Sequence, residues 1–193
     1  MKVLITGATG FFGSHLAERL LAEGFEVAIL KRSFSDTRRI NHLLPRLEQY
    51  DLDKGGLKLA FRNNKIGAVI HAATSYGRKN ESVSDVLESN LILPIRLMEA
   101  CINFGVVAFF NIDTVLPGES GHYAMSKKHF LEYARKMQEN KMRFFNLRME
   151  HMYGPGDDQT KFISGMIGRM LKNEKSISLT EGRQKRDFAY VED

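Results

Sequence analysis

Residues 2–13 read Lys2-Val3-Leu4-Ile5-Thr6-Gly7-Ala8-Thr9-Gly10-Phe11-Phe12-Gly13, in which a short apolar strand runs directly into three closely spaced glycines. A strand that turns through glycines into a helix leaves the first N–H groups of that helix facing an anion. Gly7 permits the tight turn, Gly10 lets the backbone approach a pyrophosphate, and Gly13 lets the helix pack on the strand. The spacing is GxxGxxG rather than GxGxxG, and a purely structural turn is the alternative. The stretch predicts a dinucleotide site with contacts from Gly7, Thr9, Gly10, Phe11, Phe12 and Gly13.

Short apolar runs alternate with amphipathic stretches along the rest of the chain. Strands are expected near 2–6, 25–30, 66–72, 106–112 and 142–147, with a further short strand before Asp51 and a helix after it. Longer helices are expected near 11–23, 35–46, 80–104, 120–140 and 159–173. This alternation predicts an α/β fold, with a doubly wound parallel sheet covered by helices on both faces.

The composition limits the classes of protein that the chain represents. With 193 residues, 43% hydrophobic and 26% charged, it is typical of a globular α/β domain, and it has no apolar run that spans a membrane. The absence of a signal-peptide pattern and the single cysteine, Cys101, predict a cytoplasmic protein in which Cys101 packs in the core. The net charge of +5 comes from dispersed basic residues, so small anions are expected as partners rather than nucleic acid or membrane. No spacing of ligands predicts a metal site.

A second motif predicts proton-transfer chemistry. Tyr123 and Lys127 are four residues apart near the start of a predicted helix, so their side chains share one helix face. A phenol titrates near pH 10, and a neighbouring ammonium together with an oxidised nicotinamide is expected to lower its pKa. Thr114 follows a predicted strand, at the sheet edge where ligands bind in open α/β folds. Tyr123, Lys127 and Thr114 are the candidate catalytic residues, with a solvated helix face and a loop threonine as alternatives.

These motifs resemble the extended short-chain dehydrogenase/reductase superfamily, in its nucleotide-sugar epimerase, dehydratase and reductase branch. The resemblance spans the chain and includes the glycine turn, Val69 to Ala73, Glu88 to Leu91, and Tyr123 with Lys127. It continues through Leu147-Arg148, Met152 to Gly156 and Arg186-Asp187-Phe188. It implies a Rossmann-like fold, with a nucleotide-binding domain over 1–175 and the start of a substrate lobe over 176–193. Most of that C-terminal lobe is expected to lie beyond this sequence.

The resemblance also implies roles for single residues. Tyr123 acts as acid and base, Lys127 binds the nicotinamide ribose, and Asn90 lies beside the cofactor. Asn90 has an equal alternative as a residue that bridges the chain at the start of its helix. The remaining implied contacts are with the adenine (Asp51, Leu52), the pyrophosphate and ribose (Ala72, Ala73), and the substrate (Tyr76, Arg186).

The end of the second predicted strand bears on the choice of dinucleotide. NAD-specific sites place a carboxylate there to bind the ribose hydroxyls. This chain instead has Lys31, Arg32 and Ser33, which suit a 2′-phosphate. NADP(H) is therefore favoured and NAD(H) is the alternative, with an ordinary solvated pair of cations as the structural interpretation.

The reaction is predicted from the residues around Thr114. Dehydratases of this superfamily carry an Asp-Glu pair directly after the catalytic threonine, whereas here Val115-Leu116 follows. Ser75-Tyr76-Gly77-Arg78 and Gln184 to Phe188 resemble the nucleotide-sugar 4-ketoreductases that make CDP-abequose and CDP-paratose. The prediction is an NADP(H)-dependent oxidoreductase that reduces the 4-keto group of an NDP-deoxyhexulose or NDP-dideoxyhexulose. The alternatives are an NAD-dependent 4-epimerase and a non-catalytic dinucleotide-binding module. A homodimer through helices 80–104 and 120–140 is also expected.

Overall fold

The computed structural model describes residues 1–78, 80–138 and 142–193. These residues form two compact units, Met1–Met149 and Glu150–Asp193. The division by contacts falls earlier than the domain boundary expected after residue 175, and that functional boundary stays a prediction. Each unit is described by itself.

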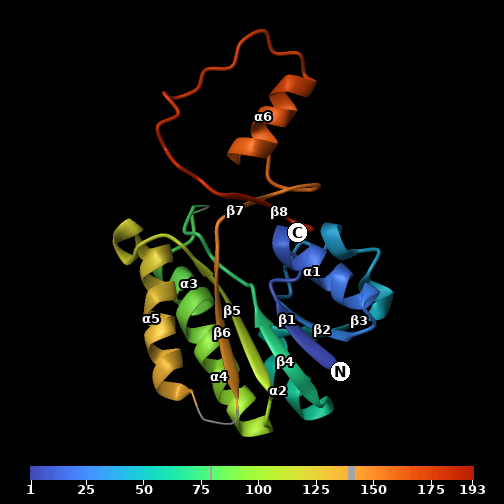
Figure 1. The fold of residues 1–193 in the computed structure, drawn as a ribbon. Coiled ribbons are helices and arrows are strands. Elements are labelled where there is room, and N and C mark those ends of the chain that lie inside the picture. Colours follow the sequence, from blue (N-terminus) through green and yellow to red (C-terminus); the bar gives the residue numbers. More distant parts are fainter. Residues whose placement is uncertain (79, 139–141) are drawn as a thin grey trace. The chain divides into compact units, whose positions relative to one another are not determined.

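The first unit contains a six-stranded, fully parallel sheet in the order β3-β2-β1-β4-β5-β6 (Figure 1). Its strands are β1 (Lys2–Thr6), β2 (Glu26–Lys31), β3 (Leu47–Asp51), β4 (Ile66–His71), β5 (Ala108–Thr114) and β6 (Arg143–Met149). The strand order runs outward in both directions from the neighbours β1 and β4. This reversal is the topological switch point at which doubly wound sheets bind ligands, and it confirms the predicted fold class.

Helices cover both faces of this sheet. They are α1 (Phe11–Ala22), α2 (Gly56–Asn63), α3 (Val83–Leu87), α4 (Leu93–Phe104) and α5 (His122–Met137). Successive strand residues point to opposite faces, so Val3 and Ile5 pack with α1 while Leu4 packs with α2, α4 and α5. Each face therefore has its own apolar core, and Cys101 of α4 is fully buried in one of them, as expected.

Two of the predicted helices differ from the structure. The stretch 35–46 forms two short 3₁₀ turns, Arg38–Ile40 and Leu44–Arg46, because the Asp36 carboxylate accepts a hydrogen bond from the Arg38 N–H and Pro45 cannot continue a helix. The predicted helix 80–104 is α3 and α4 joined by a π-helical turn, Glu88–Ile92. Residues 139–140 of the predicted helix 120–140 lie outside the described residues.

The second unit contains β7 (His151–Tyr153), α6 (Phe162–Leu171) and β8 (Phe188–Tyr190). Strands β7 and β8 pair in parallel, with Tyr153 beside Tyr190. Asp157 accepts a hydrogen bond from the Ser164 hydroxyl, which joins the loop after β7 to the first turn of α6. Helix α6 lies within the predicted range 159–173.

Candidate active site

The glycine turn lies at the switch point between β1 and β4. Gly7 has a φ of +76°, and a Cβ placed on it would lie 2.5 Å from the Ala73 nitrogen. A Cβ on Gly13 would lie 2.1 Å from the Gly7 carbonyl oxygen. Only glycine fits at either position, because backbone atoms of the Ala72-Ala73 segment and of the turn itself fill the space that a side chain needs. The structure thus brings the two predicted phosphate-binding segments together.

The N-terminus of α1 carries no side-chain cap. Gly10 is its N-cap residue and is exposed, and its N–H donates to the Gly7 carbonyl oxygen over 3.0 Å. Thr9, Phe11 and Phe12 flank Gly10 and are partly buried. An uncapped helix start with exposed backbone is a site that an anion stabilises.

The ends of β1 and β4 are joined by buried polar contacts. Thr6 Oγ1 lies 2.8 Å from Nδ1 of His71 and accepts the Ala73 N–H over 3.3 Å. Burial, with a smaller contribution from the charge of Lys127, lowers the pKa of His71 to about 3. His71 is therefore neutral at ordinary pH and serves as a packed partner of Thr6.

The ends of β2 and β3 carry the residues predicted to select the dinucleotide. Arg32 donates from Nη2 to Ser89 Oγ over 3.1 Å, and its guanidinium lies 5.7 Å from the centre of the exposed Phe34 ring. Ser33 donates from its hydroxyl to Asp51 over 2.7 Å. That hydrogen bond, the largest cause, lowers the pKa of the Asp51 carboxyl.

Lys31 and Leu52 complete this edge and are partly buried. Lys31 pairs in register with Asp51, and its charge also lowers the pKa of the Asp51 carboxyl. The edge thus joins two basic side chains, a hydroxyl and a carboxylate.

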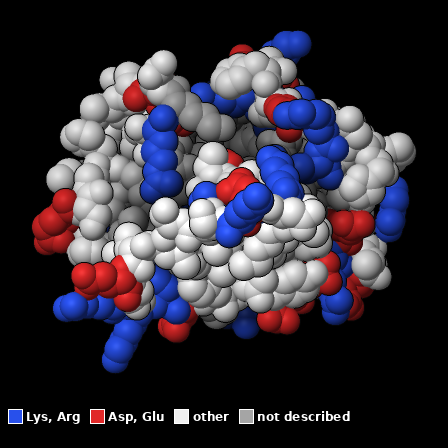
Figure 2. Space-filling model, turned by 90° about the horizontal axis from the view of Figure 1, so that it is seen from above, with Lys and Arg blue, Asp and Glu red and all other residues white. Residues whose placement is uncertain are grey.

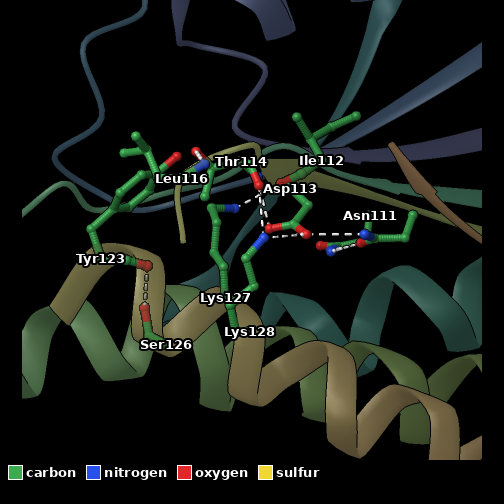
Figure 3. A network of polar contacts seen from close by, with 10 residues as sticks. Asn111, Ile112, Asp113, Thr114, Leu116, Tyr123, Ser126, Lys127 and Lys128 are labelled. Carbon is green, nitrogen blue, oxygen red and sulfur yellow. Dashed lines mark hydrogen bonds and ion pairs between the residues drawn. The ribbon is translucent and has the colours of Figure 1, made fainter. Parts of the chain in front are cut away.

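The three candidate catalytic residues lie together at the carboxyl end of β5 (Figure 3). Thr114 is the last residue of β5, and its side chain hydrogen-bonds that of Tyr123, in the first turn of α5. Lys127 Nζ lies 5.9 Å from the centre of the Tyr123 ring and donates to the carbonyl oxygen of Ile112 over 2.7 Å. Helix α5 begins at His122, directly after its N-cap residue Gly121, and Ser120 ends the preceding 3₁₀ turn, Gly118–Ser120.

Burial shifts the pKa values of this pair in opposite directions. Desolvation, the largest cause, raises the pKa of Tyr123 to about 12, although its hydrogen bond with Thr114 lowers it. Desolvation lowers the pKa of Lys127 to about 8. The expected lowering of the phenol pKa therefore does not occur in the chain alone, because the loss of hydration outweighs the neighbouring groups.

Asn90 bridges two parts of the site. Its side chain is 1% exposed; Oδ1 accepts from the Thr74 hydroxyl and the Ser75 N–H, while Nδ2 donates to the Ser75 carbonyl and to Ser126 Oγ. Ser126 in turn donates to the carbonyl oxygen of Tyr123. The geometry matches the bridging alternative, in which Asn90 holds the loop after β4 against α5.

The predicted substrate residue Tyr76 lies beside Tyr123, with ring centres 4.9 Å apart. Tyr76 is 50% exposed, and the Arg78 guanidinium lies 5.4 Å from the centre of its ring. The charge of Arg78 lowers the pKa of Tyr123. From the sequence, Arg78 enters only as part of the Ser75-Tyr76-Gly77-Arg78 resemblance, and nothing in its spacing links it to Tyr123.

A buried network next to Thr114 is absent from the sequence-based predictions. Asp113, with a side chain that is fully buried, pairs with Lys128 over 3.0 Å and accepts from Asn146 Nδ2 over 3.0 Å. Asn111 donates to Asn146 Oδ1 over 2.7 Å. The available signal was the alternation of Asn111 and Asp113 in an otherwise apolar strand, which places both side chains on one face of the sheet.

The second unit holds the other predicted substrate residue, Arg186. It is exposed, and its guanidinium donates to Gln184 Oε1 over 3.4 Å.

In the face drawn in Figure 2, Lys and Arg side chains are interspersed with acidic and uncharged ones. Among the described residues, no cluster of His, Cys, Asp and Glu suits a metal ion, and no helix has the length and apolar content that crossing a membrane requires.

Comparison with known proteins gives a consistent family. A sequence profile described as "NAD dependent epimerase/dehydratase family" matches residues 3–193. Two relatives called CDP-abequose synthase are similar along the chain, that of Salmonella muenchen with 36% identity over 100% of this chain and that of Salmonella typhimurium with 32% over 99%. This chain covers 67% and 66% of those relatives, so it spans about two thirds of their length.

A solved structure supports the same assignment. The UDP-glucose 4-epimerase of Thermus thermophilus, in complex with NAD, has 29% identity and a TM-score of 0.76, over 100% of this chain and 71% of that one. The sheet order, the glycine turn and the match over residues 3–193 agree with one another. The chain belongs to the NAD dependent epimerase/dehydratase family.

Proposed function

We propose that the protein is an NADP(H)-dependent oxidoreductase that reduces the 4-keto group of an NDP-dideoxyhexulose. The observation that carries the proposal is the juxtaposition of Tyr123, Lys127 and Thr114 at the end of β5. The similarity to relatives called CDP-abequose synthase supports a CDP-sugar as the substrate. Tyr76 and Arg186 are the proposed substrate contacts, and Tyr76 lies directly against Tyr123.

The residues at the switch point fit a nicotinamide dinucleotide. The uncapped start of α1 at Gly10 suits the pyrophosphate, and the close approach of Gly7 to Ala73 leaves bare backbone beside it. Asp51 and Leu52 are proposed to hold the adenine, Ala72 and Ala73 to line the pyrophosphate and ribose, and Lys127 to hold the nicotinamide ribose. When bound, the dinucleotide supplies hydride-transfer chemistry.

The chain's own residues then handle the proton. Tyr123 Oη donates its proton to the carbonyl oxygen of the substrate, and the Thr114 hydroxyl holds the same oxygen in place. The resulting phenolate is stabilised by the ammonium of Lys127, 5.9 Å from the ring centre. The raised pKa of Tyr123 keeps the phenol protonated before the reaction, as a general acid requires.

Lys31, Arg32 and Ser33 support NADP(H) over NAD(H). The guanidinium of Arg32 is held at the end of β2 by Ser89, where a planar fork suits the oxygens of a 2′-phosphate. The Asp51 carboxylate accepts a hydrogen bond from the Ser33 hydroxyl, so the edge formed by the ends of β2 and β3 also carries negative charge. NAD(H) remains the second candidate cofactor, because family members with solved structures, such as the Thermus thermophilus epimerase, contain NAD.

The direct test is turnover of a CDP-4-keto-dideoxyhexose with NADPH, measured as loss of reduced nicotinamide. Tyr123→Phe is expected to lower kcat about 10²- to 10⁴-fold while the Kd for NADPH stays the same. Normal turnover by Tyr123→Phe would overturn the proposal. A matched control is Tyr133→Phe, which changes an exposed tyrosine of the same helix.

The same assay separates the alternatives. A nucleotide-sugar 4-epimerase would convert its substrate without net consumption of the dinucleotide, and similarity to epimerases favours it as the second candidate. A non-catalytic module would bind the dinucleotide with no turnover of any sugar. Pairing of two chains through α3, α4 and α5, and a cytoplasmic location, belong to the same proposal.

A further inference from the structure

Asp113 is a charged group in an unusual place. Its side chain is fully buried at the carboxyl end of β5, and its partner Lys128 is 28% exposed. Besides the 3.0 Å ion pair, the carboxylate accepts the Thr114 N–H over 2.7 Å and Asn146 Nδ2 over 3.0 Å. These three partners come from β5 itself, from the neighbouring strand β6 and from α5, so the carboxylate joins three elements at the end of β5.

Two consecutive lysines of α5 hold this strand end. Lys127 donates to the carbonyl oxygen of Ile112, and Lys128 donates to that of Thr114, each over 2.7 Å. Figure 3 shows both side chains rising from α5 toward the end of β5, where Asp113 lies. These contacts fix the position of α5 along β5. They therefore also place the Tyr123 side chain next to that of Thr114.

Stability alone does not account for such a pair. Burying the Asp113 carboxylate costs hydration that its attraction to the partly exposed Lys128 ammonium does not commonly return, and apolar residues of similar volume are often as stable. Asp113 and Lys128 stand one residue from Thr114 and Lys127 respectively. A charge at these positions acts on the candidate site itself.

We propose that Asp113 and Lys128 are positioning residues of the active site, which hold α5 against β5 and balance the charge around the Lys127 ammonium. The inference rests on the proposed function, because it assigns these residues to the site proposed there. Neither of them touches the substrate in this scheme. Both act through Lys127 and Thr114.

The titratable groups that face Lys127 come from β5, β4 and α5 itself. Asp113 on β5 raises the pKa of Lys127, and Lys128 on α5 lowers it, while burial is the largest cause of the lowering. His71 on β4 is neutral at ordinary pH, and Tyr123 on α5 is a protonated phenol there, because burial raises its pKa to about 12. Asp113 and Lys128 are therefore the two charges that set the balance, and they act with opposite signs.

Because Asp113 and Lys128 shift the pKa of Lys127 in opposite directions, removing each charge in turn tests the inference. Lysine residues are labelled with ¹³C at Cε, the Lys127 signal is assigned by its loss in Lys127→Arg, and its titration is followed by NMR without substrate or dinucleotide. Asp113→Asn is expected to lower the Lys127 midpoint by about one pH unit, because an attractive charge is lost. Lys128→Met is expected to raise it by a similar amount, and the double variant to return it near the starting value.

Control variants separate an effect of charge on Lys127 from a purely structural effect of the substitutions. Lys128→Arg keeps the charge and is expected to leave the midpoint unchanged, as is Lys136→Met, which removes an exposed lysine of the same helix. Equal midpoints in Asp113→Asn and the unaltered protein, or shifts of the same sign in both single variants, would overturn the inference. If Lys128→Met does not fold, Asp113→Asn and Lys128→Arg decide the question.

Measurements of enzyme activity provide a second, independent test. In the reductase assay, Asp113→Asn and Lys128→Met are expected to lower kcat and to shift the alkaline limb of its pH profile in opposite directions, with little change in KM. The absence of turnover in the unaltered protein would overturn the proposed function. It would leave the NMR titration, and what that titration shows of the charge balance, intact.

Discussion

The ammonium of Lys127 lies 5.9 Å from the centre of the Tyr123 ring, one helical turn away, while its hydrogen bond goes to the Ile112 carbonyl. Tyr123 and Lys127 are therefore already close together without a bound dinucleotide or substrate. The hydrogen bond of Lys127 holds it to the sheet rather than to Tyr123. Burial raises the phenol pKa to about 12 and lowers the ammonium pKa to about 8, so each group is held in the protonation state that the proposed reaction starts from at neutral pH.

Burial of Lys127 predicts a specific dependence of stability on pH. Its folded-state pKa of about 8 lies below its ordinary value of 10.5, so between these values the unfolded chain binds more protons and the folded state gains stability as pH rises. The cost of burying the charge is fully present below pH 8. In Lys127→Met this pH-dependent gain is lost.

Urea unfolding tests this at about pH 7 and about pH 9.5. The free energy of unfolding of the unaltered protein, relative to that of Lys127→Met, is expected to increase by about 2 kcal/mol between these conditions. A difference that stays constant, or that shrinks with rising pH, would show that Lys127 is not buried as an ammonium. The window ends below pH 10, where the tyrosines begin to titrate.

The glycine turn predicts a large steric effect at Gly7. Gly7→Ala introduces a Cβ 2.5 Å from the Ala73 nitrogen, whereas Gly105→Ala, at a similar φ of +68°, meets nothing within 4 Å. Gly105→Ala is expected to cost about 1 kcal/mol for its left-handed backbone alone. Gly7→Ala is expected to cost at least about 2 kcal/mol more, because backbone must move. Equal losses in urea unfolding would contradict the close approach of the two segments.

Arg32 is expected to distinguish the two dinucleotides. Arg32→Ala is predicted to raise the Kd for NADPH about 10- to 100-fold, since charge-assisted hydrogen bonds to the 2′-phosphate are lost, and to change the Kd for NADH less than about 3-fold. The measurement is titration of nicotinamide fluorescence. Arg38→Ala, which removes an exposed arginine paired with Asp36, is the control and should leave both values unchanged. Equal losses for both dinucleotides would argue against 2′-phosphate selection by Arg32.

Asn90 is expected to be needed for stability rather than for chemistry. Asn90→Ala leaves the Ser75 N–H and carbonyl without their partner in a buried position, and is predicted to lower the free energy of unfolding by about 2–4 kcal/mol. Asn41→Ala, which removes an exposed amide bonded to Thr37, is expected to change it by less than about 0.5 kcal/mol. A small effect at Asn90 would mean that the bridge between the loop and α5 is dispensable.

Several elements were predictable because their signals are local. The strand, the glycine turn and the helix after it follow from residues 2–13, and the four-residue spacing of Tyr123 and Lys127 is a property of any helix. The helix expected over 35–46 was wrong for reasons that are also local, since Asp36 competes for the Arg38 N–H and Pro45 interrupts the pattern.

The sequence by itself determined the α/β alternation, the glycine turn and the identity of the candidate reactive pair, because each depends on neighbours within about one turn or one strand. Only the tertiary structure decided that Asn90 bridges the loop after β4 to α5, that Asp113 meets Lys128, and that the phenol is raised in pKa. These features depend on burial and on contacts between elements far apart in the chain. Desolvation and long-range pairing have no signature in the spacing of residues, since they arise only when the sheet and its helices close around them.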